Sequence, residues 1–139
     1  QEEIVNAYDN TILYTDHIVS MVIDKLKQRS NTVSGAVLYF SDHGESLGEN
    51  GIYLHGTPYI IAPSQQTHVP MLVWMADDLA KAAGFDMACL AKRAADGTYS
   101  HDNIFHSVLG MMDVATKVYD PALDVFAACR TPSNTLAQN

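Results

Sequence analysis

The feature that most constrains the fold is a short apolar run that ends in a cluster of metal-binding side chains. Residues 35–41 are uncharged and rich in apolar, strand-favouring side chains. Their hydrophobicity is continuous rather than alternating, which is typical of a strand covered on both faces, as in a parallel α/β sheet. Asp42, His43 and Gly44 follow at once. Because ligands of open α/β sheets bind beyond the carboxyl ends of the strands, this edge is the predicted functional site.

The residues after this run include two carboxylates and two imidazoles. Asp42 and His43 are adjacent, and adjacent side chains of an extended strand point to opposite faces. Both can reach one ion only if the chain leaves the strand here, which Gly44 permits. Glu45 and His55 add two potential ligands on the glycine-rich segment that follows. Oxygen and nitrogen ligands without a nearby cysteine favour zinc, manganese or iron.

Two other interpretations use the same residues. In the first, Asp42 caps a turn and His43 is a loop histidine satisfied by hydrogen bonds. In the second, the sequence Gly-Glu-Ser-Leu-Gly at 44–48 matches the G-x-S-x-G nucleophile elbow of serine hydrolases, with Ser46 as the nucleophile. That elbow needs a helix straight after the serine, and residues 47–51 contain two glycines and an asparagine, which disfavour a helix. The sequence therefore favours a metal site and keeps the serine hydrolase and a non-catalytic module as alternatives.

The rest of the chain predicts an alternation of helices and strands around this edge. Apolar residues at three-four spacing indicate an amphipathic helix near the start of the chain. A long segment with several glycines and prolines is typical of a functional loop. The expected elements are a helix over about 4–29, a strand over about 35–41, a metal-site loop over 42–67, a strand over about 69–74, helices to about 114, a short strand over 123–126 and a frayed tail over 131–139.

Charge and hydropathy exclude two classes of protein. The net charge is −8, and nucleic-acid binding requires clustered Lys and Arg, so no nucleic-acid partner is expected. No apolar run approaches the ~20 residues that a membrane-spanning helix needs.

The length of 139 residues corresponds to one domain, 1–139. The acidic start at Gln1 is unlike a signal peptide and looks like an internal point of a longer protein.

The two cysteines, Cys89 and Cys129, leave the cellular compartment open. They can form a disulfide in an oxidising space, or they can be two buried thiols in a reducing one. The residues alone favour neither interpretation.

Several longer motifs resemble those of one enzyme family. The main motif is Tyr-Phe-Ser-Asp-His-Gly-Glu-Ser-Leu-Gly-Glu-Asn-Gly at 39–51, followed by Leu-His-Gly-Thr-Pro-Tyr at 54–59. Further matches lie at 6–11, 62–70 and 100–106. By these motifs the chain is identified as a member of the phosphoethanolamine–lipid A transferases, which include the colistin-resistance enzymes. The combination is more specific than Asp-His-Gly alone, which the wider alkaline-phosphatase and sulfatase superfamily shares.

The resemblance implies a three-layer α/β/α sandwich of the alkaline-phosphatase type, of which this chain is the C-terminal portion. It also implies a zinc-dependent enzyme that moves phosphoethanolamine from phosphatidylethanolamine to lipid A and so confers polymyxin resistance. Asp42 and His43 match the family's zinc ligands. His55 matches a histidine that contacts the phosphoryl group or a second metal. Glu45 lies where some members have a second-site carboxylate.

The resemblance further implies which parts of the enzyme lie elsewhere. The family's nucleophilic threonine is upstream, and Thr57 and Thr67 are in the wrong motifs to replace it. The fragment alone is therefore expected to be inactive, with the upstream half of the same catalytic domain as its partner. Family members are membrane-anchored, which places this segment at the periplasmic face of the Gram-negative inner membrane. In that oxidising compartment, a disulfide between Cys89 and Cys129 is expected.

Overall fold

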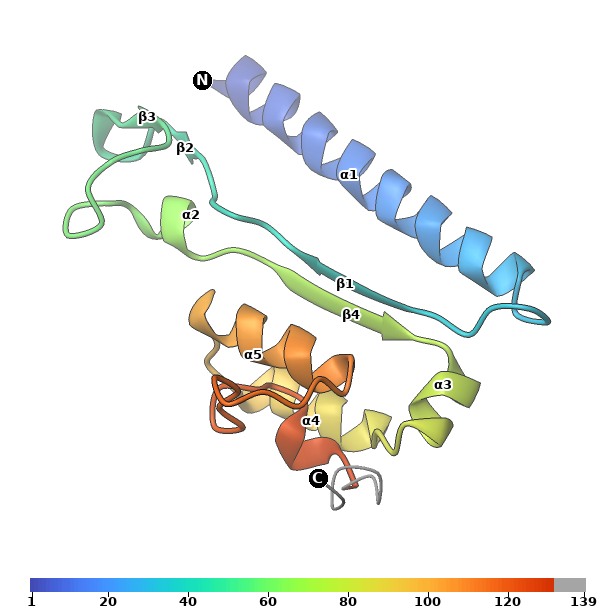
Figure 1. Cartoon of the computed structure of the whole chain (residues 1–139). Coiled ribbons are helices and arrows are strands. Elements are labelled where there is room, and N and C mark those ends of the chain that lie inside the picture. Colours follow the sequence, from blue (N-terminus) through green and yellow to red (C-terminus); the bar gives the residue numbers. More distant parts are fainter. Residues whose placement is uncertain (132–139) are drawn as a thin grey trace. The chain divides into compact units, whose positions relative to one another are not determined.

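Figure 1 shows the computed structural model of the chain, which describes residues 1–131. The chain forms two compact units, Gln1–Ala76 and Asp77–Asn139. Apart from Thr131, the tail expected over 131–139 lies outside the described residues. No helix of the described part is long and apolar enough to cross a membrane.

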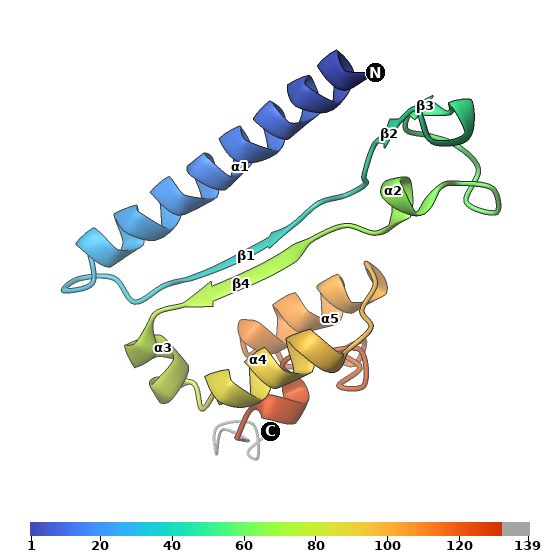
Figure 2. The same ribbon diagram turned by 180° about the vertical axis from the view of Figure 1, so that it is seen from behind.

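The first unit begins with a long amphipathic helix, α1 (Glu2–Gln28), where a helix over about 4–29 was expected. Two glutamates in its first turn and two lysines in its last turn stabilise it by opposing the helix dipole. Figures 1 and 2 show α1 running alongside the strands of this unit. Within the described structure no side chain of α1 is buried, and Leu13 and Tyr14 are each 66% exposed. The helix therefore contributes little buried apolar area to this unit.

Two longer strands form the centre of the first unit. β1 (Ala36–Phe40) and β4 (Met71–Met75) pair antiparallel, with Leu38 opposite Val73. This pairing differs from the parallel sheet that the continuous apolar run predicted. The physical reason is the connection over 41–70, which is a loop with short elements instead of a long crossover helix, so the chain returns alongside itself. The carboxyl end of β1 is where the candidate site begins.

The loop after β1 contains a small hairpin. β2 (Ser46–Leu47) pairs antiparallel with β3 (Tyr53–Leu54), and the 3-10 turn η1 (Glu49–Gly51) joins them. His55 follows β3 directly, so the hairpin returns it to the segment that leaves β1. A single-turn helix, α2 (Ser64–Thr67), lies between the hairpin and β4.

The second unit is helical over most of its described residues. Its elements are α3 (Asp77–Ala82), α4 (Met87–Asp96), α5 (Asp102–Met111) and the 3-10 turn η2 (Ala127–Cys129). Cys89 in α4 and Cys129 in η2 form a disulfide, with their Cα atoms 5.6 Å apart. Phe126, which is 1% exposed, lies in the core of this unit. α5 ends before the expected limit of about 114 because Asp113 adopts a left-handed conformation with φ 57°.

Residues 123–126, expected as a short strand, form turns instead. The reason lies in side chains that accept hydrogen bonds from the backbone amides of this segment. The Phe126 amide donates to the Asp124 carboxylate over 2.8 Å, and the Val125 amide donates to the Ser107 hydroxyl over 3.0 Å. Because side chains already accept hydrogen bonds from these amides, the segment does not pair as a strand.

A tyrosine in the second unit gives a prediction about alkaline stability. The Tyr119 hydroxyl donates to the Asp124 carboxylate over 2.7 Å. Burial, together with the hydrogen bond and negative charge of Asp124, raises the pKa of Tyr119 from 10.0 to about 12. A raised pKa contributes stability that is complete below pH 10.0 and is lost as the pH rises to about 12. We therefore expect the free energy of unfolding of Tyr119→Phe to decline less over this pH range than that of the unmodified chain. Urea unfolding at several alkaline pH values measures it, and identical slopes would contradict it.

Candidate metal centre

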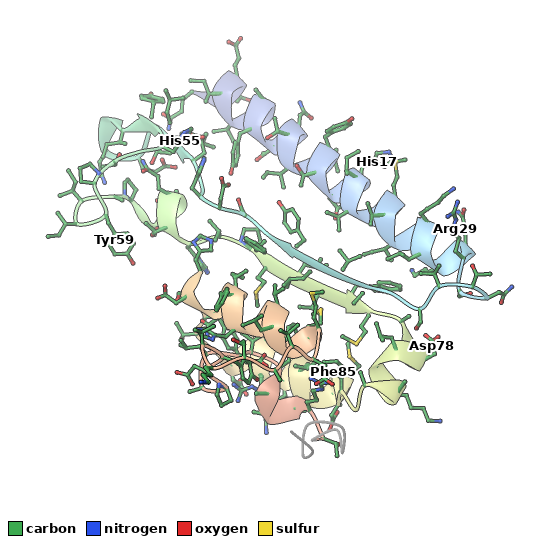
Figure 3. All side chains as sticks on the ribbon, in the orientation of Figure 1. His17, Arg29, His55, Tyr59, Asp78 and Phe85 are labelled. Carbon is green, nitrogen blue, oxygen red and sulfur yellow. A yellow bond between two sulfur atoms is a disulfide. The ribbon has the colours of Figure 1, made fainter. Side chains whose placement is uncertain are left out.

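Three of the four predicted ligands meet where the chain leaves β1. His43, Glu45 and His55 each offer one ligand atom, and these atoms lie within 4.8 Å of one another. His55 Nδ1 lies 3.0 Å from Glu45 Oε2, and the rings of His43 and His55 stack with 4.0 Å between their centroids. Figure 3 shows His55 at the hairpin end of the first unit. The β2–β3 hairpin therefore brings His43 and Glu45, which precede it in the chain, close to His55, which follows it.

Asp42 lies outside this group of three. Its side chain is 86% exposed, and its Oδ2 lies 3.9 Å from His43 Nε2. His43 Nδ1 lies 2.9 Å from the carbonyl oxygen of Gly44. Since a carbonyl only accepts, Nδ1 carries the proton and Nε2 keeps a lone pair for a ligand. Ligand atoms on a tetrahedral zinc with bonds of ~2.1 Å lie roughly 3.4 Å apart, so the exposed Asp42 side chain would have to move slightly closer to His43 to share one ion.

A divalent cation fits these residues on chemical grounds. Two imidazoles and a carboxylate are ligands of the kind that catalytic zinc takes in proteins. The other oxygen of Glu45, Oε1, is buried and has no hydrogen-bond partner in the described structure. A buried carboxylate oxygen without a partner is energetically costly, and a cation bound beside Glu45 would supply one.

Ser46 does not have the geometry of a catalytic nucleophile. It lies in β2, is 1% exposed, and its hydroxyl accepts a hydrogen bond from Gln66 Nε2 over 2.8 Å. The element that follows is the short turn η1 and not a helix packed on a sheet. A nucleophile elbow exposes its serine beside a general base, so the structure contradicts the serine-hydrolase interpretation.

Residues 1–114 match the sulfatase family. The chain belongs to the sulfatase family. It is 50% identical over 130 residues to phosphoethanolamine transferase EptA of Salmonella typhimurium, covering 94% of this chain and 24% of that protein. It is 42% identical over 120 residues to phosphatidylethanolamine transferase Mcr-1 of Escherichia coli, covering 86% of this chain and 20% of that protein. This sulfatase-family chain thus spans about a quarter of the length of the curated relatives it matches.

Two solved structures show the same fold. The soluble domain of lipooligosaccharide phosphoethanolamine transferase A from Neisseria meningitidis is 50% identical, with a TM-score of 0.88 over 93% of this chain and 39% of that one. The C-terminal periplasmic domain of phosphoethanolamine transferase EptC from Campylobacter jejuni is 45% identical, with a TM-score of 0.76 over 93% of this chain and 39% of that one. The predicted α/β class and the resemblance to phosphoethanolamine transferases are therefore confirmed.

Gln66, which no sequence pattern singled out, holds the site segment together. Its side chain is 6% exposed, and its Nε2 donates to Ser46 Oγ over 2.8 Å and to Thr57 Oγ1 over 3.0 Å. Its Oε1 accepts from the Thr57 amide over 3.3 Å. A glutamine in a polar run gives no local signal, because its role depends on partners 9 and 20 residues away in the chain.

Gly44 is required by packing as well as by the bend after β1. Its amide donates to the carbonyl oxygen of Gln66 over 3.0 Å. A Cβ at this position would lie 1.8 Å from the carbonyl oxygen of Gln65, far closer than any real contact. The sequence indicated the bend, whereas the close approach of the chain before β4 is visible only in the structure.

We expect Gln66→Ala to lower the free energy of unfolding of the first unit by about 2–3 kcal/mol, because it leaves the buried hydroxyl of Ser46 and the part-buried polar groups of Thr57 without this partner. Urea denaturation measures the loss, and hydrogen exchange at the Thr57 amide should locate it in the site segment. Gln65→Ala is the matched control, since Gln65 is exposed and should change stability by less than about 0.5 kcal/mol. Equal effects of the two substitutions would contradict the role of Gln66.

Proposed function

We propose that this chain forms the metal- and phosphoryl-binding part of a zinc-dependent phosphoethanolamine transferase. The enzyme would move phosphoethanolamine from phosphatidylethanolamine to lipid A at the periplasmic face of the inner membrane and so confer polymyxin resistance. The observation that carries the proposal is the meeting of His43, Glu45 and His55 at the end of β1, in a chain similar over most of its length to transferases of this name. The upstream half of the same membrane-anchored enzyme would be its partner.

Zinc would be held by Asp42 and His43, with Glu45 and His55 toward the phosphoryl group. Bound zinc lowers the pKa of a hydroxyl nucleophile and neutralises negative charge on phosphoryl oxygens. His43 presents Nε2, because its Nδ1 is taken by the Gly44 carbonyl.

Glu45 and His55 form the phosphoryl-binding half of the proposed site. Glu45 Oε2 lies 3.0 Å from His55 Nδ1, so the carboxylate favours a proton on that nitrogen and fixes the ring's orientation. With its Nδ1 side held by Glu45, the His55 ring would present Nε2 to the phosphoryl group. In the proposed site His55 would contact the phosphoryl group, and Glu45 would hold the ring in position.

A transfer assay tests this proposal. The chain joined to the upstream half of the domain is incubated with lipid A and a fluorescent phosphatidylethanolamine analogue, with and without a chelator. We expect transfer in zinc-loaded protein, loss of at least about 100-fold on chelation, and recovery when zinc is restored. Transfer that is indifferent to chelation would overturn the zinc dependence.

A zinc titration of the 139-residue chain separates the transferase from a non-catalytic module. We expect calorimetry to detect weak zinc binding, since these residues supply only part of a coordination shell. The heat should disappear in His43→Ala. No heat in the unmodified chain would favour a module with a vestigial site.

A further inference from the structure

The loop between β3 and α2 carries three consecutive large apolar residues at its tip. Tyr59, Ile60 and Ile61 are 85%, 93% and 64% exposed. Figure 1 shows this loop extending outward from the first unit, and Figure 3 labels Tyr59 on it. Neighbouring aliphatic and aromatic side chains in water are unfavourable unless another surface covers them.

The exposed tip is a defined turn whose start is held by hydrogen bonds. The Ile61 amide donates to the Pro58 carbonyl over 2.9 Å, which closes the turn. Before the turn, Thr57 is bonded through both its amide and its hydroxyl to the buried side chain of Gln66. The loop therefore presents its apolar tip outward on a fixed base.

The composition of the surrounding segment indicates what covers the tip. The chain has a net charge of −8, yet no Asp, Glu, Lys or Arg occurs between Glu49 and Asp77. No ionised carboxylate or ammonium of this loop has to leave water when the tip enters an apolar phase. Tyrosine beside aliphatic residues is favoured at a membrane–water interface, where the ring is buried and the hydroxyl stays hydrated. A protein partner would more often be met by a rim that includes charged side chains, and Asp, Glu, Lys and Arg are absent from this segment.

We propose that Tyr59, Ile60 and Ile61 insert into the interfacial layer of a phospholipid bilayer. Because His55 lies just before the tip in the same loop, insertion holds the candidate site at the level of the lipid headgroups. The tip thus acts as a docking element that is separate from the metal ligands. This inference draws on the proposed function only for the choice of lipid, and it needs neither zinc nor transfer.

Fluorescence on vesicles of phosphatidylethanolamine and phosphatidylglycerol tests the insertion, with chelator present throughout. Ile60→Cys is labelled with an environment-sensitive dye, since the Cys89–Cys129 disulfide leaves the new cysteine as the only thiol. Val118→Cys is the matched control, because Val118 is also an exposed aliphatic residue (62%) but lies beside a lysine. We expect a blue shift and quenching by nitroxide-labelled lipid at position 60 and neither at position 118.

The partition coefficient of the protein between water and vesicles then tests whether the tip residues are responsible for vesicle binding. Ile60→Ser combined with Ile61→Ser should lower the vesicle partition coefficient at least about tenfold, and Val118→Ser should change it less than about twofold. Three results would overturn the proposal: no lipid quenching at position 60, equal quenching at positions 60 and 118, or a dye at position 60 already shielded without vesicles. Transfer to lipid A measured with a water-soluble donor is independent of vesicle binding, so failure here leaves the proposed function intact.

Discussion

His43→Ala is expected to lower phosphoethanolamine transfer at least about 100-fold and to abolish stable zinc binding. His43 is the residue common to both halves of the site: its Nε2 lies 3.9 Å from the Asp42 carboxylate, and its ring stacks on His55. Removing the imidazole would therefore take away a proposed ligand and the ring contact with His55. Initial transfer rates and the zinc content after dialysis measure the two effects in the domain that contains this chain.

His68→Ala is the control for that experiment. His68 is an exposed histidine that follows α2 and is absent from the ligand group. Its substitution should change the transfer rate and the zinc content less than about twofold, as expected for an exposed residue outside the site. A His43→Ala enzyme that retained both its zinc and its activity would show that the metal lies elsewhere.

Loss of the Cys89–Cys129 disulfide is expected to lower the free energy of unfolding of the second unit by about 4 kcal/mol. The bond joins residues 40 apart in the sequence, and closing a loop of that size restricts the unfolded chain by roughly this amount. The first turn of α4 contains Cys89, whose amide is capped by Asp86, so the cross-link also holds η2 to a well-formed helix start. Urea unfolding of the oxidised chain and of Cys89→Ser with Cys129→Ser, followed by hydrogen exchange at the amides of α4 and α5, measures the loss.

The first unit provides an internal control for the disulfide. Trp74, the chain's sole tryptophan, lies in β4, so its fluorescence reports on that unit. The tryptophan transition should stay within about 0.5 kcal/mol of its value in the oxidised chain. An unfolding transition of α4 and α5 that did not move after loss of the bond would contradict the predicted stabilisation.

The sequence alone indicated the candidate site because its signal is local. An apolar run followed by Asp42, His43 and Gly44 marks a strand end with ligands, whatever the rest of the chain does. The meeting of Glu45 with His55 depends on the β2–β3 hairpin, which the glycine-rich segment indicated only as a loop. The antiparallel partner of β1 was not predictable, since continuous hydrophobicity reports burial and not the direction of the neighbouring strand.

Other features depend on hydrogen bonds between distant residues. Residues 123–126 are apolar enough to suggest a strand, but the hydroxyl of Ser107, on another element, accepts from the Val125 amide. Gln66 likewise acts through partners on two other segments. Such hydrogen bonds cannot be predicted from the pattern of residue types along the chain, because a polar side chain that is buried and paired has the same pattern as one that is exposed to solvent.

The hydrogen bond between the Gly44 amide and the Gln66 carbonyl makes the two ends of the site loop neighbours. The loop formed by residues 45–65 therefore starts and ends at the same place in the structure. An insertion near Tyr59 would lengthen the tip of this loop without shifting the register of β1 and β4. Lengthening a closed loop is inexpensive, about 0.6 kcal/mol for each doubling. The depth to which the loop reaches can therefore vary by insertion or deletion while His43 keeps its place.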